Sequence, residues 1–213
     1  MQIQDCRRNT RSTEYRPVSR WLWNSLLGVI ALTLAAALGL VVALALGWNN
    51  PRPVAPPDWQ HPGLSPRLVA PPGEDAVALL DFSGDDLTLE AKARPLSGPT
   101  FNGYGLIYRA QDSARYIVLA VSGDGYYVVL KVTGDEETAL VDWQQFPHVH
   151  RGQQSNRLRV TCAGPTCRFY INDEYATTVA DDTWRAGDIG LWVRSFGEEN
   201  VTVQFEDVRA WVE

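Results

Sequence analysis

The acidic side chains in the C-terminal two thirds of the chain are the first candidates for chemistry. Two carboxylates that share a strand face at ~5 to 5.5 Å can act as nucleophile and acid on a glycosidic bond. Glu206 and Asp207 are neighbours, so a strand turns them to opposite faces. The pairs 198–199 and 181–182 fall in predicted turns. We interpret these acids as solvated surface groups and predict no catalytic residue.

Cys162 and Cys167 are placed for a disulfide if the segment between them is a hairpin. With 163–166 as a four-residue loop, the two cysteines lie opposite each other, where cross-strand Cβ atoms come within ~4.5 to 5.5 Å. Two thiolates without a nearby histidine supply too few ligands for a zinc site. We therefore predict a disulfide that fixes the hairpin register, with Cys6 reduced and unpaired.

The histidines and turn aspartates do not indicate a metal site. His148 and His150 alternate, but no third ligand lies near them in the sequence. Asp124 stands between two glycines, which a hairpin turn already explains. We predict no cofactor from these residues.

Aromatic and basic side chains are the remaining candidates, because the chain has eight Trp and eight Tyr. Flat rings can stack on a ligand while Arg and Lys donate hydrogen bonds. Packing in the core is the competing interpretation for each ring. The predicted ligand-binding residues are Tyr116, Tyr127, Lys131, Arg109, Trp192 and Arg194.

Short strands with period-two alternation must position these side chains, since residues 75–213 show no long amphipathic helix. Turn residues separate the strands. The predicted strands are 76–82, 87–93, 104–110, 115–122, 126–133, 138–143, 157–162, 167–172, 175–180, 188–195 and 201–212. This number and spacing predict an antiparallel sandwich or barrel.

Alternation also predicts which side chains are buried. If Asp124 and Gly125 form a two-residue turn, the core face holds Ile117, Leu119, Val121, Val128, Leu130 and Val132. The opposite face is too apolar for an ordinary solvated surface. We therefore expect another layer to cover it, or we expect it to form the floor of a groove. In the cysteine hairpin the same rule places Leu158, Val160, Phe169 and Ile171 inside, with Arg157, Arg159, Arg168 and Tyr170 outside.

The N-terminal part has a different composition. No charged residue occurs in 21–50, and a run of this length can cross a ~30 Å hydrocarbon core. Trp21, Trp23 and Trp48 flank it, as is typical of membrane interfaces. Five arginines precede it and two follow nearby, which predicts a cytoplasmic N-terminus. A signal peptide cleaved after Ala45 is the alternative, and either exports the rest of the chain.

Composition divides the chain into four parts. They are a cytoplasmic arm (1–20), a transmembrane helix (21–48), a Pro-rich stalk with eight prolines (49–73) and a β domain (74–213). We interpret the stalk as a solvated spacer, and docking of Trp59 and Leu64 on the β domain is the alternative. The β domain carries 12 basic and 22 acidic side chains. A surface this acidic is a poor nucleic-acid partner, because phosphate contacts need basic groups.

Seven segments of the β domain together resemble the concanavalin A-like lectin/glucanase jelly roll, in the branch of 3-keto-disaccharide hydrolase-like and laminin-G-like domains. They are 103–109, 122–127, 130–131, 140–143, 156–160, 169–172 and 187–193. The resemblance covers about residues 76–213 and implies an all-β, antiparallel two-sheet jelly-roll sandwich. Many lectins of this fold bind calcium, so the resemblance alone implies a possible Ca²⁺ site.

Retaining glycosidases of this fold carry a Glu-x-Asp-x-x-Glu pattern on one strand, and this chain has none. The sequence therefore favours a membrane-anchored, extracytoplasmic, non-catalytic module for carbohydrate or a cell-envelope polymer. A glycoside hydrolase-like enzyme and a protein-interaction or sensor ectodomain are the alternatives.

Overall fold

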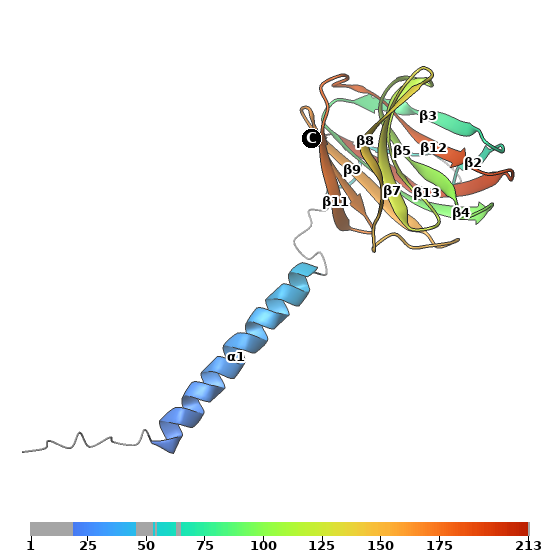
Figure 1. Ribbon diagram of the computed structural model, residues 1–213. Helices are drawn as coiled ribbons and strands as arrows, with labels where there is room; N and C mark the ends of the chain where they lie inside the picture. Colours follow the sequence, from blue (N-terminus) through green and yellow to red (C-terminus); the bar gives the residue numbers. More distant parts are fainter. Residues whose placement is uncertain (1–18, 46–52, 54, 63–64, 213) are drawn as a thin grey trace, which may run out of the picture. The chain divides into compact units, whose positions relative to one another are not determined.

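The computed structural model describes residues 19–45, 53, 55–62 and 65–212. The chain forms two units, Met1–Leu46 and Gly47–Glu213. The first contains helix α1 (Arg20–Ala45), and the second is an antiparallel sandwich of two sheets (Figure 1). This is the all-β class with one preceding helix that the sequence predicted.

Helix α1 is long and apolar enough to cross a membrane. Its 26 residues span about 39 Å at 1.5 Å per residue. The Ser19 hydroxyl accepts a hydrogen bond from the Leu22 backbone N–H at 3.4 Å, which caps the first turn. By length and composition α1 is a candidate membrane span, and an N-terminal signal sequence meets the same criterion. Residues 46–48 of the predicted span lie outside the described residues.

The first sheet has seven strands in the order β1-β13-β4-β9-β10-β11, with β2 also pairing with β13. Its strands are β1 (Trp59–Gln60), β2 (Arg67–Ala70), β4 (Leu87–Ser97), β9 (Asn156–Ala163), β10 (Thr166–Ile171), β11 (Glu174–Ala180) and β13 (Val201–Val212). The outer face of this sheet is rich in charged residues, and ion pairs such as Lys92–Asp207 (2.7 Å) neutralise part of that charge.

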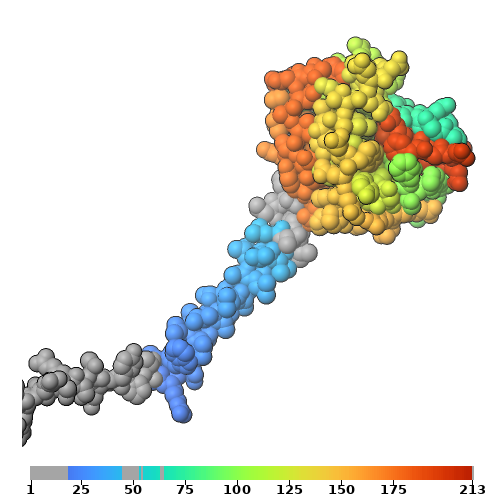
Figure 2. All heavy atoms as spheres, viewed as in Figure 1, coloured from blue at the N-terminus to red at the C-terminus, as the bar shows by residue number. Residues whose placement is uncertain are grey.

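The second sheet has six strands in the order β3-β12-β5-β6-β7-β8. Its strands are β3 (Asp75–Gly84), β5 (Asn102–Asp112), β6 (Arg115–Val121), β7 (Tyr126–Thr133), β8 (Glu136–Gln145) and β12 (Gly187–Ser195). The side chains of both sheets fill the space that the ribbons leave open (Figure 2). The candidate site described below lies on this second sheet.

Every strand predicted from residue 76 onward is present, but two strands were not predicted. Strands β1 and β2 lie within 49–73, where the sequence predicted a solvated stalk, and both pair with β13. The prediction of a free spacer is therefore wrong for these residues. Neither strand contains a proline; the prolines flank them, at 56, 57, 62, 66, 71 and 72, and so remove no N–H from the pairing.

The main core lies between the sheets. It includes Ile117, Leu119 and Val121 from β6, and Leu158, Val160, Phe169 and Ile171 from the cysteine hairpin, as predicted. The predicted core residues Val128, Leu130 and Val132 of β7 instead face away from it, and Tyr127 and Val129 take their place.

The length of one loop explains the error in β7. Val121 pairs with Tyr127, and the Ser122 backbone N–H donates to the Tyr126 carbonyl at 2.9 Å. The loop is thus Gly123–Gly125, three residues long and not two, and Gly125 adopts a φ of 101° that suits glycine. A shift of one residue turns each β7 side chain to the opposite face.

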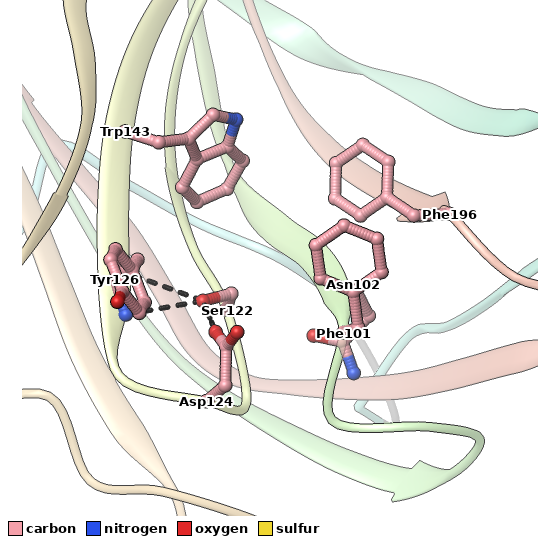
Figure 3. Close-up of a pocket in the computed structure, with 7 residues that line it drawn as sticks. All are labelled: Phe101, Asn102, Ser122, Asp124, Tyr126, Trp143 and Phe196. Atoms are coloured by element: carbon pink, nitrogen blue, oxygen red, sulfur yellow. Dashed lines mark hydrogen bonds between the residues drawn. The ribbon is translucent and has the colours of Figure 1, made fainter.

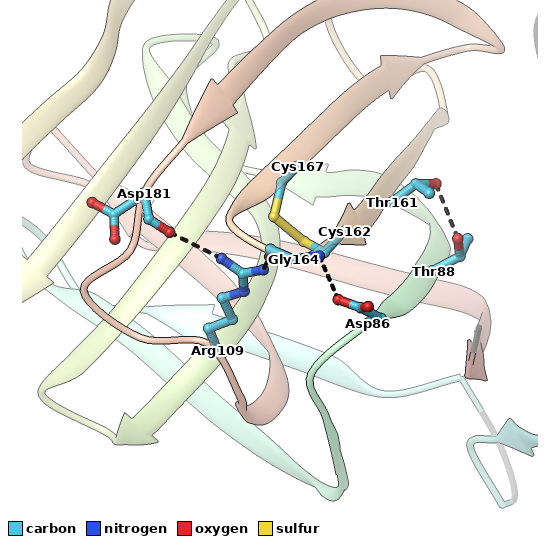
Figure 4. The surroundings of a disulfide bond; sticks show 8 residues. All are labelled: Asp86, Thr88, Arg109, Thr161, Cys162, Gly164, Cys167 and Asp181. Atoms are coloured by element: carbon cyan, nitrogen blue, oxygen red, sulfur yellow. Dashed lines mark hydrogen bonds between the residues drawn. A yellow bond between two sulfur atoms is a disulfide. The ribbon is translucent and has the colours of Figure 1, made fainter.

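The disulfide between Cys162 and Cys167 is present, with a Cα–Cα distance of 4.1 Å. The two residues are direct partners across β9 and β10, as predicted. Ala163 also pairs with Thr166, so the loop holds two residues where four were predicted. The Gly164 N–H in this loop donates to Asp86 Oδ1 at 2.6 Å, which ties the hairpin to the start of β4 (Figure 4).

Candidate functional site

The outer face of the six-stranded sheet is concave. Arg194 on β12 forms ion pairs with Asp75 on the adjacent β3 and with Glu137 on β8. Strands β5, β6 and β7 lie between β12 and β8 in the sheet. Strands in a flat sheet are ~4.8 Å apart, so four steps would separate β12 from β8 by about 19 Å. The sheet must therefore curl for Arg194 to reach Glu137.

Glycines on the concave face make room for this curl. A Cβ on Gly103 would lie 2.7 Å from Cζ3 of Trp192, and one on Gly190 would lie 2.8 Å from the Ala78 carbonyl oxygen. Both distances are shorter than van der Waals contact allows. The missing side chains let the Trp192 ring lie against the backbone of β5 and let β12 approach β3.

Apolar side chains fill the middle of the concave face. The residues buried there are Ile107, Ala110, Tyr116, Val118, Ala120, Val128, Leu130, Val132 and Trp192. Burial raises the pKa of Tyr116 to about 12, because the phenolate would lose its hydration. The sequence predicted that this face is covered or floors a groove, and its centre is covered.

An ionic cluster of Asp75, Glu137 and Arg194 lies over this apolar layer; we call it the Arg194 cluster. Arg194 Nη1 donates to Glu137 Oε2 at 2.8 Å, and Nη2 donates to Asp75 Oδ2 at 2.6 Å. The Trp192 indole N–H also donates to Asp75 Oδ2, at 3.1 Å. The hydrogen bonds from Arg194 lower the pKa of Glu137 more than burial raises it. These bonds hold β3, β12 and β8 together across the concave face.

The concave face opens into a pocket at one end, with a volume of about 370 Å³. We call it the aromatic pocket. It is lined by Phe101, Asn102, Ser122, Asp124, Tyr126, Trp143 and Phe196 (Figure 3). These residues come from the start of β5 and the residue before it, the β6–β7 loop, the start of β7, β8 and the segment after β12. Phe101 and Phe196 flank the paired residues Asn102 and Ser195, whereas Trp143 on β8 reaches Phe196 because the sheet curls.

Three of the four aromatic rings are well exposed. The exposed fractions are 61% for Phe101, 38% for Tyr126 and 37% for Trp143. The rings of Phe101 and Phe196 have centroids 5.0 Å apart, and Trp143 meets Phe196 edge to face at 6.0 Å. These exposed rings line the pocket and are not part of the core between the sheets. Their clustering around a hollow is typical of a binding site.

Buried polar groups fix the wall of the aromatic pocket. Asn102 is 2% exposed, and its Oδ1 accepts a hydrogen bond from the Gly123 N–H at 3.1 Å. The Ser122 hydroxyl donates to Asp124 Oδ1 and accepts from the Tyr126 N–H, the latter at 3.1 Å. The turn that carries Asp124 is therefore held in place without a ligand.

The predicted ligand-binding residues divide among three places. Tyr116, Trp192 and Arg194 lie together in and over the apolar layer, next to the aromatic pocket but not among its lining residues. Tyr127 lies in the core between the sheets, where its hydroxyl accepts a hydrogen bond from Gln144 at 2.9 Å. Their role in binding remains a prediction.

Arg109 and Lys131 meet at Asp181, far from the pocket. Lys131 Nζ lies 2.9 Å from Asp181 Oδ2. Arg109 is 1% exposed and donates to the backbone carbonyls of Asp181, at 3.2 Å, and Gly164 (Figure 4). Arg109 and Asn102 are seven residues apart on β5, or about 23 Å along a strand. This second cluster holds the cysteine hairpin loop against the sheet.

The sequence missed most of the aromatic pocket. Trp143 was recognised only as one of several flat rings, while Phe101 and Phe196 were not considered. Phe101 follows Pro99 by two residues and Phe196 directly precedes Gly197, and both lie outside the alternating strand patterns. A large aromatic residue in a turn is not expected to fill the core. This unusual position is the feature of the sequence that could have indicated the pocket.

The carboxylates near the pocket do not form a pair suited to hydrolysis. Asp124 is the carboxylate among the lining residues. Asp75 and Glu137 are both bound by Arg194, which lowers the pKa of Glu137, whereas a general acid needs a raised pKa. Among the described residues, no three His, Cys, Asp or Glu side chains are grouped to hold a metal ion.

The chain matches no protein-family model and no curated protein. Solved structures do resemble it. A carbohydrate-binding module from Bacillus subtilis matches with a TM-score of 0.56 and 19% identity, over 64% of this chain and 81% of its own. A functionally unknown protein from Saccharomyces cerevisiae matches with a TM-score of 0.54 and 13% identity, over 75% and 95%.

A GH43 protein from Bacillus licheniformis also matches, with a TM-score of 0.52 and 10% identity, over 70% of this chain and 33% of its own. At these identities the likeness concerns the fold. The sandwich has the concanavalin A-like jelly-roll fold that the sequence motifs predicted.

Proposed function

We propose that the sandwich is a non-catalytic carbohydrate-binding module that takes a sugar in the aromatic pocket. The observation that carries this proposal is the group of exposed rings, Phe101, Tyr126 and Trp143, packed around a preformed hollow with Phe196. A sugar ring presents an apolar C–H face that can stack on such rings. Its hydroxyl groups can donate hydrogen bonds to Asp124 at the wall.

The comparison with the Bacillus subtilis module supports the same class of ligand, because that protein is named as a carbohydrate-binding module and shares the fold. The lowered pKa of Glu137 and the single carboxylate lining the pocket support binding without hydrolysis. We also propose that α1 is an uncleaved anchor with a cytoplasmic N-terminus and that the sandwich lies outside the cytoplasm. The arginines before α1 and the disulfide support this placement.

A glycan array with the full-length protein in lipid nanodiscs tests the binding proposal, followed by titration calorimetry with the strongest glycan. Trp143→Ala should weaken binding about tenfold or more, because a stacked aromatic ring of this kind contributes on the order of 1.4 kcal/mol. The matched control is Tyr175→Ala, since Tyr175 is 49% exposed and does not line the pocket. No binding to any glycan by the folded protein would refute the proposal, as would equal losses for both variants.

A further inference from the structure

The aromatic pocket has an unbalanced charge. Its seven lining residues include one carboxylate, Asp124, and no Lys, Arg or His. The Ser122 hydroxyl donates to Asp124 Oδ1, and within the described part of the chain Oδ2 has no protein hydrogen-bond donor. Asp124 is half-buried and lines the pocket.

The surroundings add to the negative charge. Arg194 lies beside Phe196, with its guanidinium carbon 5.8 Å from the ring centroid, but it is shared by two carboxylates, Asp75 and Glu137. The Arg194 cluster therefore carries a net charge of −1. Glu198 and Glu199 are exposed in the loop that follows Phe196. A basic group, Arg151, lies against Gly125 in the same turn, but it is not among the residues that line the pocket.

The rings themselves favour a cation. Phe101, Tyr126, Trp143 and Phe196 come from different segments and surround one hollow, so a ligand group inside it meets more than one π face or edge (Figure 3). An organic ammonium is attracted to the faces of such rings within about 6 Å. A carboxylate at the same hollow can add a charge-assisted hydrogen bond.

We propose that the aromatic pocket selects sugars that carry a protonated amine over the same sugars with a hydroxyl or an N-acetyl group at that position. This inference rests on the proposed sugar-binding function and names the ligand class of that site. The rings hold the apolar face of the sugar, and Asp124 Oδ2 accepts a hydrogen bond from the ammonium. Uronic acids and phosphorylated sugars are disfavoured, because no basic side chain lines the pocket to replace their hydration.

The test compares matched ligands on the full-length protein in nanodiscs at mildly acidic pH, where the sugar amine carries its proton. Glucosamine, glucose and N-acetylglucosamine differ at one position, as do galactosamine, galactose and N-acetylgalactosamine. We expect the amino sugar of at least one set to bind about three- to tenfold more tightly than its neutral partners, as a cation–π contact with a partly exposed ammonium predicts. Raising the salt concentration should reduce this preference.

Asp124→Asn keeps the side-chain shape and an oxygen that accepts from Ser122, but removes the charge. It should reduce the preference for the amine, measured as the ratio of amino-sugar to neutral-sugar affinity in the same variant, to the part that the rings alone provide. Asp135→Asn is the matched control, because Asp135 is an exposed turn aspartate outside the pocket. Sugar binding without any preference for the amine would overturn this inference and leave the proposed function standing. A preference as large in Asp124→Asn as in the original protein would also overturn it, whereas absence of all sugar binding would refute the proposed function itself.

Discussion

Gly103 shows how one residue decides the shape of the concave face. A Cβ at this position would lie 2.7 Å from Cζ3 and 3.0 Å from Cη2 of Trp192. The indole is fully buried and its N–H is bound by Asp75, so the ring has no room to move aside. Packing at this position therefore excludes every side chain larger than hydrogen.

Gly103→Ala should accordingly destabilise the sandwich by about 1 to 3 kcal/mol, as overpacking of a rigid core does. Urea unfolding of the fragment of residues 47–213, followed by tryptophan fluorescence, measures the loss. Gly197→Ala is the control, because its Cβ would make only an ordinary 3.7 Å contact with Pro99. Equal effects of the two substitutions would show that the Trp192 contact does not limit position 103.

The aromatic pocket could not be predicted from the sequence because its residues are brought together by strand pairing and by the curl of the sheet. Phe101 and Phe196 are separated by 95 positions, and no local pattern relates them. The prediction for β7 failed for a different reason, since a Gly-Asp-Gly loop fits both a two-residue and a three-residue turn. The pairing of Cys162 with Cys167 was predictable, because in a short hairpin two residues that flank the loop can hardly avoid lying opposite each other.

At the scale of elements, the strands themselves were predictable and the closure of the sheet was not. Period-two alternation and turn residues marked each strand from β3 to β13. Alternation gives no information about curvature, so the approach of β8 to β12 had no sequence signal. The Arg194–Glu137 ion pair is the contact that joins these two strands over the apolar layer.

This contact predicts a pH dependence of stability. Arg194 lowers the pKa of Glu137, so Glu137 binds its proton more readily in the unfolded chain than in the folded one. The resulting stabilisation is complete above the unfolded pKa of about 4.3 and is lost as the pH falls through the folded value. Asp181 and Asp207 also have lowered pKa values, so the whole domain should lose stability in acid, with Glu137 responsible for part of the loss.

Glu137→Gln should therefore lower the free energy of unfolding by about 1 kcal/mol near neutral pH, a modest value because the side chain is partly exposed to solvent. At acid pH, below the lowered folded-state pKa of Glu137, the difference from the original protein should shrink towards zero, since Glu137 is then protonated in both states. Urea unfolding at the two pH values measures this. Glu136→Gln removes the same charge from the adjacent residue and should show no such dependence; a constant difference for Glu137→Gln would contradict the ion-pair explanation.

At the scale of the whole molecule, the three parts of the chain differ in charge in a way that fits the proposed topology. The arm of residues 1–20 is basic, α1 has no charge after Arg20, and the sandwich is acidic. Basic residues favour the cytoplasmic side of a membrane helix. An acidic surface suits a soluble domain and adds to the negative field around Asp124, which links the overall charge to the ligand class proposed for the pocket.

The cysteines allow this topology to be tested without any substitution. Cys162 and Cys167 form the disulfide, so Cys6 is the remaining thiol of the three cysteines. In intact cells, a membrane-impermeant maleimide should leave the protein unlabelled, and it should label Cys6 once the membrane is permeabilised. If the N-terminus lay outside, the protein would already be labelled in intact cells, which would reverse the proposed orientation.

If the segment were a signal peptide cleaved after Ala45, Cys6 would be lost. The mature protein would then stay unlabelled under both conditions and show a correspondingly smaller mass. Only retention of the full mass together with labelling after permeabilisation agrees with an uncleaved anchor that holds the sandwich outside the cytoplasm.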